Sequence, residues 1–229
     1  MQIAGFDKVS LLNYPDKVAA TIFTNGCNYA CPYCQNSALV LDTKDNILID
    51  EEEVLSYLED RKKILDGLCI TGGEPTIQKD LAEFIYKVKK IGLSVKLDTN
   101  GSNPDVIRLL LDNNLLDYIA MDIKGVFNKY NEITNRNVNL DRIKESINII
   151  KNCNIDYEFR TTVIKEYTSY EDLIHILEYL NCNKYFIQKF EDRDTNIMPN
   201  LQAYTDDELK EIYLKLKNKY DYIKIRGLA

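Results

Sequence analysis

The sequence predicts an α/β fold in the form of an incomplete, TIM-like barrel of parallel strands, of the (β/α)6 type. Two observations predict it. Short apolar runs typical of strands alternate with segments whose apolar residues recur at helical spacing, and six to seven such pairs follow one another. Repeated strand–helix pairs imply a parallel sheet with right-handed crossovers. Their number is too large for a small open sheet and too small for a complete eight-fold barrel.

The individual elements follow from local patterns along the chain. Short apolar runs predict strands at residues 18–23, 67–71, 93–97, 118–121, 157–160, 185–188 and 222–225. Amphipathic periodicity predicts helices at residues 50–65, 80–91, 104–113, 140–152, 170–180 and 206–218. Asp50 is the expected N-cap of the first helix, with Glu53 completing a capping box, and Gly92 is expected to end the second helix.

Length and composition indicate one domain spanning residues 1–229 and limit the classes of partner. No Pro/Gly/Ser-rich stretch divides the chain, and 229 residues are enough for one sizeable core. The net charge of −7 comes from interspersed acidic and basic residues, which argues against nucleic acid as a partner. Neither a signal peptide nor an apolar run of membrane-spanning length is recognisable, so we expect a cytoplasmic protein without membrane contact.

Three of the six cysteines form a C-x3-C-x2-C motif directly after the first predicted strand, at Cys27, Cys31 and Cys34. In a reducing compartment such clustered cysteines favour metal binding over disulfides. Structural zinc sites and ordinary electron-transfer iron–sulfur clusters use four protein ligands. Three thiolates without a fourth therefore leave one metal coordination position free for a small molecule.

Two other interpretations of this motif remain open. The cysteines could be buried free thiols, or they could bind zinc together with a distant fourth ligand. His175, the only histidine, lies in a helical pattern far along the chain, which argues against a Cys3His site. Cys69, Cys153 and Cys182 are isolated and are interpreted as small core residues.

Polar residues and glycines collect directly after the predicted strands. Carboxyl ends of parallel strands share one face of a barrel, where such folds build their sites. Alone, each group has an ordinary interpretation as a turn, a helix cap, a surface ion pair or an edge residue. Their recurrence behind successive strands beside the cysteine loop instead predicts a shared site, formed by Gly72, Gly73, Glu74, Asp98, Thr99, Asn100, Asp122, Lys124 and Arg160.

The combination of these motifs resembles the radical S-adenosylmethionine (SAM) superfamily. The resemblance rests on the three-cysteine loop, with Tyr33 just before the last cysteine, and on Gly-Gly-Glu after the second strand. Within that superfamily, residues 5–6, 12–15, 97–102 and 118–124 resemble activating enzymes of glycyl radical enzymes. The activating proteins of anaerobic (class III) ribonucleoside-triphosphate reductase, in their longer form related to pyruvate formate-lyase activases, are the most similar.

The resemblance implies two cofactors and a set of contacts. Cys27, Cys31 and Cys34 would hold three irons of a [4Fe-4S] cluster, and SAM would chelate the fourth. The implied SAM-binding residues are Tyr33, Gly72, Gly73, Glu74, Asp98, Asn100, Lys124 and Arg160. In this scheme the two glycines let the backbone approach the methionine amino group, and Glu74 also anchors its loop.

Finer roles follow from the same resemblance. Asp98 and Lys124 would contact the polar methionine end of SAM, Arg160 its carboxylate or ribose, and the region of Tyr33 its adenine. A monovalent cation is implied beside SAM, at Asp98, Thr99 and Asp122.

The implied reaction is the formation of a glycyl radical on a partner enzyme. A reduced cluster would donate one electron to the sulfonium, the C5′–S bond would break, and the 5′-deoxyadenosyl radical would remove a hydrogen atom from a glycine. The implied partners are anaerobic ribonucleoside-triphosphate reductase and a flavodoxin or ferredoxin as electron donor. Such chemistry needs no acid–base pair, in keeping with a chain that holds a single histidine.

Two departures from related activases bear on the target. Only Cys69 lies between the cysteine loop and Gly-Gly-Glu, so a second cluster in a ferredoxin-like insert is not expected. Pyruvate formate-lyase activases place a histidine after the sixth strand, where this chain has Phe190 and Glu191. The alternatives are a radical SAM enzyme that acts on another glycyl radical enzyme or on a small molecule, and a non-catalytic zinc or iron–sulfur protein.

Overall fold

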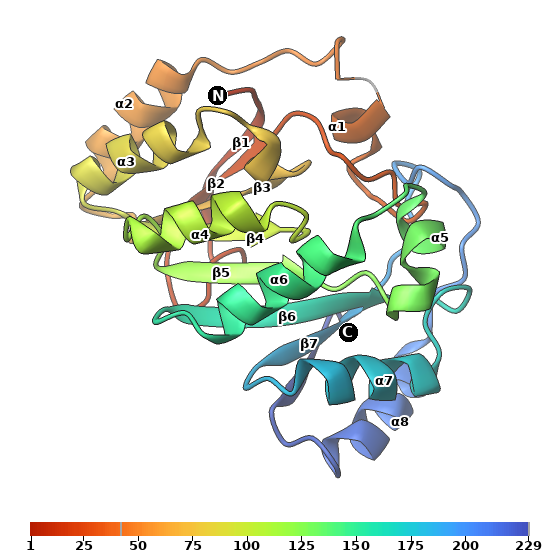
Figure 1. Cartoon of the computed structure of the whole chain (residues 1–229). Helices are drawn as coiled ribbons and strands as arrows, with labels where there is room; N and C mark the ends of the chain where they lie inside the picture. The colour runs from red at the N-terminus through yellow and green to blue at the C-terminus, as the bar shows by residue number, and fades with distance from the viewer. Residues whose placement is uncertain (42, 229) are drawn as a thin grey trace.

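The computed structural model describes residues 1–41 and 43–228 and contains one curved sheet whose strands follow the order of the chain (Figure 1). The sheet confirms the predicted parallel α/β architecture, because every neighbouring pair from the second strand onward is parallel. The strands are β1 (Ile3–Ser10), β2 (Ala19–Thr24), β3 (Gly67–Gly72), β4 (Ser94–Thr99), β5 (Tyr118–Asp122), β6 (Asp156–Val163), β7 (Tyr185–Lys189) and β8 (Ile223–Arg226).

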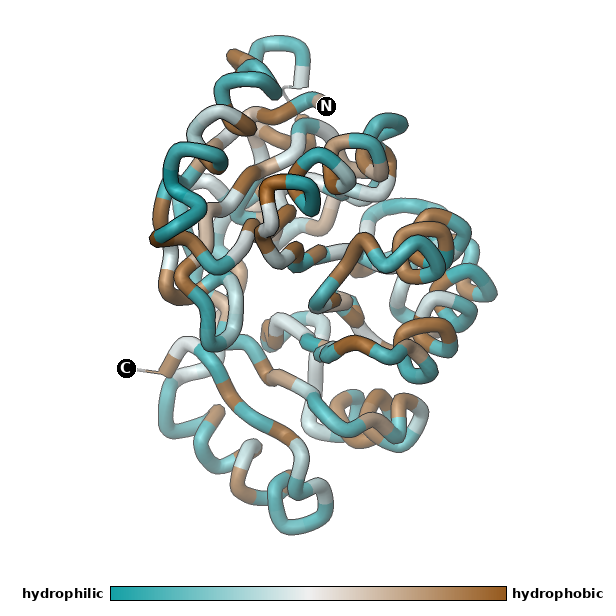
Figure 2. Tube along the Cα trace, turned by 90° about the vertical axis from the view of Figure 1, so that its left-hand side faces the viewer, coloured by the Kyte–Doolittle hydropathy of each residue, from teal (hydrophilic) through white to brown (hydrophobic). Residues whose placement is uncertain are grey.

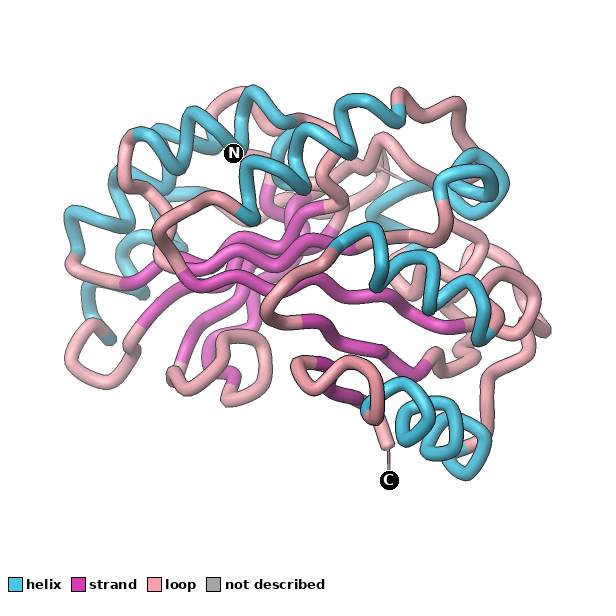
Figure 3. The backbone as a smooth tube through the Cα atoms, turned by 60° about the horizontal axis from the view of Figure 1, so that its bottom comes forward, coloured by secondary structure: helices cyan, strands magenta, loops and turns pink. Residues whose placement is uncertain are grey.

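The helices lie on the outer side of the curved sheet (Figure 3). They are α1 (Ser37–Leu41), α2 (Glu51–Arg61), α3 (Leu81–Ile91), α4 (Pro104–Asp112), α5 (Tyr130–Thr134), α6 (Leu140–Lys151), α7 (Tyr170–Leu180) and α8 (Asp206–Lys217), with 3-10 turns η1 (Pro75–Ile77) and η2 (Phe127–Lys129). All six predicted helices are confirmed, whereas the short α1 and α5, both near the mouth of the barrel, were not foreseen.

The first strand is the main feature that the sequence pattern missed. β1 pairs antiparallel with β2 at the edge of the sheet, and Gly5 lies opposite Phe23. Only Ile3 of β1 is buried, and the strand includes a glycine and two charged residues. Because an edge strand exposed on one side needs no continuous apolar run, its pattern was too weak to predict.

Two predicted helix boundaries depend on caps. Asp50 does cap α2, but its side chain accepts a hydrogen bond from the N–H of Glu52 at 3.0 Å instead of the Glu53 N–H that a capping box uses, and the helix ends at Arg61. Gly92 ends α3 in the left-handed conformation at φ 96°, as predicted. The left-handed region is costly for residues with a Cβ, which accounts for glycine there.

The apolar core lies between the sheet and the helices. Hydrophobic residues (brown) recur along the helices at the spacing of one buried face (Figure 2). Cys69 and Cys182 are buried as predicted for core residues, whereas Cys153 is only partly buried. Among the described residues, no helix is both long and apolar enough to span a membrane.

Candidate functional site

A cavity of about 290 Å³ opens at the carboxyl ends of the parallel strands, and all the predicted site residues line it. The lining includes the three cysteines of the motif and Tyr33, the stretch Gly72, Gly73 and Glu74, the stretch Asp98, Thr99 and Asn100, and the charged residues Asp122, Lys124 and Arg160. The fold therefore brings together residues that span more than half of the sequence. Lining the same cavity does not show what each residue binds, but the contacts of each residue within the protein distinguish their roles.

Backbone hydrogen bonds to distant segments fix the cysteine loop. The N–H of Ala30 donates to the carbonyl of Thr134 at the end of α5, at 2.9 Å. From the segment after β7, the N–H of Met198 donates to the carbonyl of Pro32 at 2.8 Å and that of Ile197 to the carbonyl of Cys34 at 3.2 Å. Because these bonds involve the backbone, the loop keeps its shape without a disulfide, and all three thiols stay free.

The thiols suit an iron–sulfur cluster better than one zinc ion. A structural zinc ion takes four protein ligands that converge on one point, whereas the cysteine loop supplies three. Cysteines that each bind a different iron need only face the same cavity, as Cys27, Cys31 and Cys34 do. Burial raises the pKa of Cys27 to about 12, so metal coordination would be needed to keep it as a thiolate at neutral pH.

Gly72 and Gly73 let the end of β3 approach the backbone that leads into the cysteine loop. A Cβ on Gly73 would lie 1.9 Å from the carbonyl oxygen of Gly26, and one on Gly72, which has φ +110°, would lie 2.4 Å from the nitrogen of Thr24. The N–H of Gly73 donates to Thr24 at 2.9 Å and that of Glu74 to Gly26 at 2.8 Å. Glycine is thus required at both positions for the close approach of two backbone segments of the protein, apart from any approach to a ligand.

Glu74 connects the end of β3 to the end of β4 from a fully buried position. One of its oxygens accepts from the N–H of Thr76 at 3.1 Å and from the hydroxyl of Thr99 at 2.7 Å. The other accepts from the N–H of Asn100 at 2.7 Å. Burial raises the pKa of Glu74 in spite of these bonds. This geometry supports the expected anchoring role, because both oxygens are engaged by the protein.

Asn100 holds the cysteine loop to the segment after β4. Its amide nitrogen donates to the side-chain oxygen of Asn28 at 2.8 Å, and its oxygen accepts from the N–H of Ser102 at 2.9 Å. Asn28 in turn donates to the hydroxyl of Ser102 at 2.8 Å. Asn28 lies between the first two cysteines of the motif, so this small network fixes the loop relative to β4.

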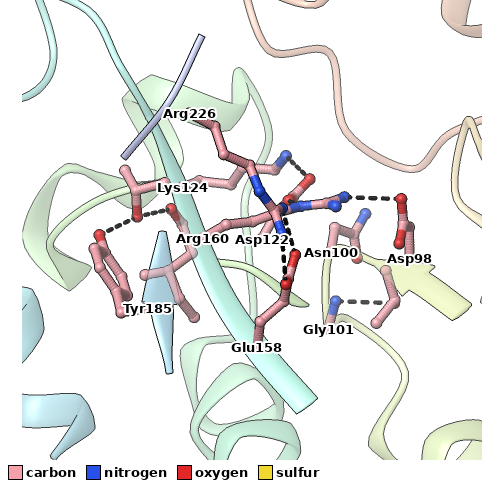
Figure 4. A network of polar contacts seen from close by, with 12 residues as sticks. Asp98, Asn100, Gly101, Asp122, Lys124, Glu158, Arg160, Tyr185 and Arg226 are labelled. Atoms are coloured by element: carbon pink, nitrogen blue, oxygen red, sulfur yellow. Dashed lines mark hydrogen bonds and ion pairs between the residues drawn. The ribbon is translucent and has the colours of Figure 1, made fainter. Parts of the chain in front are cut away.

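Charged side chains form a chain of ion pairs across the floor of the cavity (Figure 4). Arg160 on β6 pairs with Asp98 on β4, at 3.1 Å from Nη2 to Oδ2, and through Nε with Asp122 on β5. The outer ends are Lys96, which pairs with the other oxygen of Asp98, and Lys124, whose Nζ lies 3.0 Å from Asp122. The series Lys96–Asp98–Arg160–Asp122–Lys124 forms what we call the charge ladder.

Mutual pairing keeps the charge ladder ionised. Burial opposes the charge on Asp122, but Arg160, ahead of Lys124, outweighs it and holds the pKa of that carboxyl well below its ordinary range. Arg160 and Lys96 similarly outweigh burial and lower the pKa of Asp98. Three cations and two carboxylates leave the ladder with a formal charge of +1. An anionic group such as a carboxylate would therefore be favoured above it.

The predicted monovalent cation would share its ligands with the charge ladder. Each carboxylate oxygen of Asp98 and Asp122 already pairs with a lysine or arginine. The Thr99 hydroxyl donates to Glu74 and accepts from the N–H of Gly101 at 3.1 Å. A cation would have to share these oxygens with their present partners or displace one of them, and no step of the chemistry is assigned to it.

Sequence reasoning missed several residues of the site. Lys96 is buried below Asp98, and Thr71, Gln188 and Lys189 line the cavity. The alternation of a strand places residues 96 and 98 on the same face. A lysine two positions before a strand-end aspartate was therefore the available signal. Phe190 follows β7, the sixth parallel strand, as expected from the sequence, and packs 6.5 Å from the ring of Tyr33.

Comparison with known protein families decides the class of the site. The model of the radical SAM superfamily matches residues 21–180. The chain belongs to the radical SAM superfamily. It is therefore an enzyme whose cofactors are a [4Fe-4S] cluster and SAM, and the cysteine loop that lines the cavity has the thiol donors that a cluster needs.

Two proteins of Methanocaldococcus jannaschii are similar to this chain in sequence. The chain is 35% identical over 99% of its length, and 96% of the relative's, to a protein named as a glycyl-radical enzyme activating enzyme, MJ1227. A second protein with the same enzyme name, MJ1632, is 35% identical over 51% of this chain and 43% of its own length.

A solved structure supports the fold independently. The crystal structure of Streptococcus suis SuiB bound to S-adenosylmethionine matches 88% of this chain and 48% of its own with a TM-score of 0.72 and 14% identity. At that identity the likeness establishes the partial barrel alone.

Proposed function

We propose that this radical SAM enzyme activates a glycyl radical enzyme, and that its target is an anaerobic ribonucleoside-triphosphate reductase. The observation that carries the proposal is the 35% identity, along nearly the whole chain, to a protein named as an activating enzyme of this kind. The motifs at residues 97–102 and 118–124 support activation of a glycyl radical enzyme, and Phe190 in place of a histidine argues against pyruvate formate-lyase.

The proposed roles of the residues follow from their positions around the cavity. Cys27, Cys31 and Cys34 would hold the cluster, which together with SAM supplies one-electron cleavage and a hydrogen-abstracting radical. The net positive charge ladder suits the carboxylate of the SAM methionine, with Lys124 and Arg160 as the two ladder cations that line the cavity.

An aromatic wall beside the cysteine loop is the proposed site for the adenine, and the segment after β7 is proposed to exclude water from that side. Tyr33 is buried and its ring lies 6.3 Å from that of Tyr167, so an aromatic wall borders the cysteine loop. An adenine placed there would stack on apolar surface. The segment after β7 closes the same side of the loop through the backbone bonds of Ile197 and Met198. A flavodoxin or ferredoxin is the proposed source of the electron.

Anaerobic electron paramagnetic resonance tests the proposal. The reconstituted, reduced protein is mixed with SAM and the anaerobic ribonucleotide reductase of the same organism, and 5′-deoxyadenosine is measured in the same tube. A glycyl radical doublet formed together with deoxyadenosine supports both chemistry and target. Deoxyadenosine without the doublet refutes the reductase and redirects the search to other glycyl radical enzymes or small molecules.

A further inference from the structure

Arg226 reaches into the barrel from the last strand, which lies beyond the residues that the superfamily model matches. Its guanidinium forms a bidentate pair with Glu158 on β6, at 2.6 Å from Nη1 to Oε1 and 2.9 Å from Nη2 to Oε2. The guanidinium carbon also lies 3.5 Å from the centre of the Phe186 ring on the intervening β7. Arg226 thus crosses one strand to reach its carboxylate.

Glu158 has no solvent exposure and depends on protein partners for its charge. Besides Arg226, the hydroxyl of Tyr118 donates to its Oε2 at 2.7 Å. Burial disfavours the charge of Glu158, but the bonds from Arg226 and Tyr118 outweigh it and lower the pKa of that carboxyl. A buried carboxylate that loses its cation must find another or become protonated.

An alternative cation on the same strand is Arg160, a member of the charge ladder. Glu158 and Arg160 are two residues apart on β6, so their side chains point to the same inner face of the barrel. The two side chains already attract each other electrostatically. Figure 4 shows the guanidinium groups of Arg226 and Arg160 in the same part of the barrel, with Glu158 beside them. Without Arg226, Glu158 would compete with Asp98 and Asp122 for Arg160.

We propose that Arg226 is a positioning residue for the SAM site: by pairing with Glu158 it leaves Arg160 bound to Asp98 and Asp122. This inference rests on the proposed role of the charge ladder in binding SAM. It gives a role in the site to β8, a strand that carries neither the three-cysteine motif nor a glycine-rich end.

The competition makes a specific prediction for a pair of substitutions. Arg226→Met keeps much of the apolar contact with Phe186 but leaves Glu158 without its cation, and we expect SAM to bind about tenfold more weakly. Adding Glu158→Gln removes the competing charge and keeps an acceptor for Tyr118. The double variant is therefore expected to recover SAM affinity to within about threefold of the wild type.

Equilibrium dialysis with radiolabelled SAM measures the affinity of the reconstituted proteins, and thermal unfolding of the apoproteins measures folding separately. Arg226→Lys keeps the charge and tests the proposal if the methionine variant does not fold; it should bind SAM more tightly than Arg226→Gln. Arg108→Met, which removes a surface arginine paired with Glu145, is the control.

Three outcomes separate the possibilities. Recovery of SAM affinity in the double variant supports positioning, because a merely structural role for β8 predicts that the double variant stays as weak as the single one. Unchanged SAM affinity in Arg226→Met, or no recovery on adding Glu158→Gln, overturns the inference. Wild-type protein that carries a cluster but fails to bind SAM would instead refute the proposed roles of the site itself.

Discussion

Replacing Gly73 by alanine should separate the end of β3 from the cysteine loop. The added Cβ would lie 1.9 Å from the carbonyl oxygen of Gly26, where ordinary contacts begin at 3.4 Å, so the two segments must move apart by about 1.5 Å. The bonds from Gly73 to Thr24 and from Glu74 to Gly26, now 2.9 and 2.8 Å, would then exceed hydrogen-bonding distance.

The expected cost follows from those two bonds. A net contribution of about 1 kcal/mol for each bond, with a further penalty of about 1 kcal/mol for a buried group left without a partner, predicts a loss of about 3 kcal/mol in unfolding free energy. Cluster content should fall as well, because the displaced backbone leads directly into Cys27. Chemical unfolding of the apoprotein and iron and sulfide content after anaerobic reconstitution measure the two effects.

Gly92→Ala provides the matched control. Gly92 has φ +96°, but no heavy atom lies within 4 Å of the position that an added Cβ would take, so only the backbone conformation is strained, at about 1 kcal/mol. Its cluster content should equal that of the wild type. If Gly73→Ala unfolds within about 0.5 kcal/mol of the wild type and takes up a full cluster, the steric reasoning is wrong.

Three further substitutions test separate parts of the site. Cys31→Ala should abolish both the cluster and SAM cleavage, whereas Cys182→Ala, in the core, should keep full iron content. Equal iron loss in the two variants would contradict the assignment of Cys31 as a cluster ligand. Ion pairing lowers the pKa of Asp122 below its ordinary value of 3.8, so the ionised carboxylate stabilises the fold above pH 3.8 and this stabilisation is lost as the pH falls below that value. Asp122→Asn should therefore flatten the acid limb of the curve of unfolding free energy against pH. Tyr29→Phe should change the unfolding free energy by less than about 0.5 kcal/mol, since the buried hydroxyl has no hydrogen-bond partner among the described residues; a larger loss in chemical unfolding would reveal one.

The repeating pattern of the chain was sufficient to predict most of the fold. Strands buried on both faces have continuous apolar runs, and β2, β3, β5 and β7 all appear within two residues of their predicted positions. β1 lacks that signal because it is exposed along one side. The short α1 and α5 lack it as well, because a single turn or so of helix is stabilised by its surroundings and not by its own periodicity.

The composition of the site was also predictable, but its internal contacts were not. Position near the carboxyl end of a predicted strand was enough to bring Asp98, Asp122 and Arg160 to one mouth, although the structure places them within β4, β5 and β6. Nothing in the spacing shows that Arg160 joins the two aspartates, or that Arg226 reaches across β7 to Glu158. Such contacts depend on the curvature of the sheet and on side-chain length, neither of which has a local pattern in the sequence.

The two halves of the site are held in different ways, and this difference bears on how each would receive its cofactor. Backbone bonds and the Glu74 and Asn100 side chains fix the cysteine loop, whereas the charge ladder is held by its own ion pairs. The cations proposed to face SAM are thus oriented by protein contacts. Preformed charges cost little reorganisation when the ligand arrives, which is how electrostatic sites achieve both affinity and orientation.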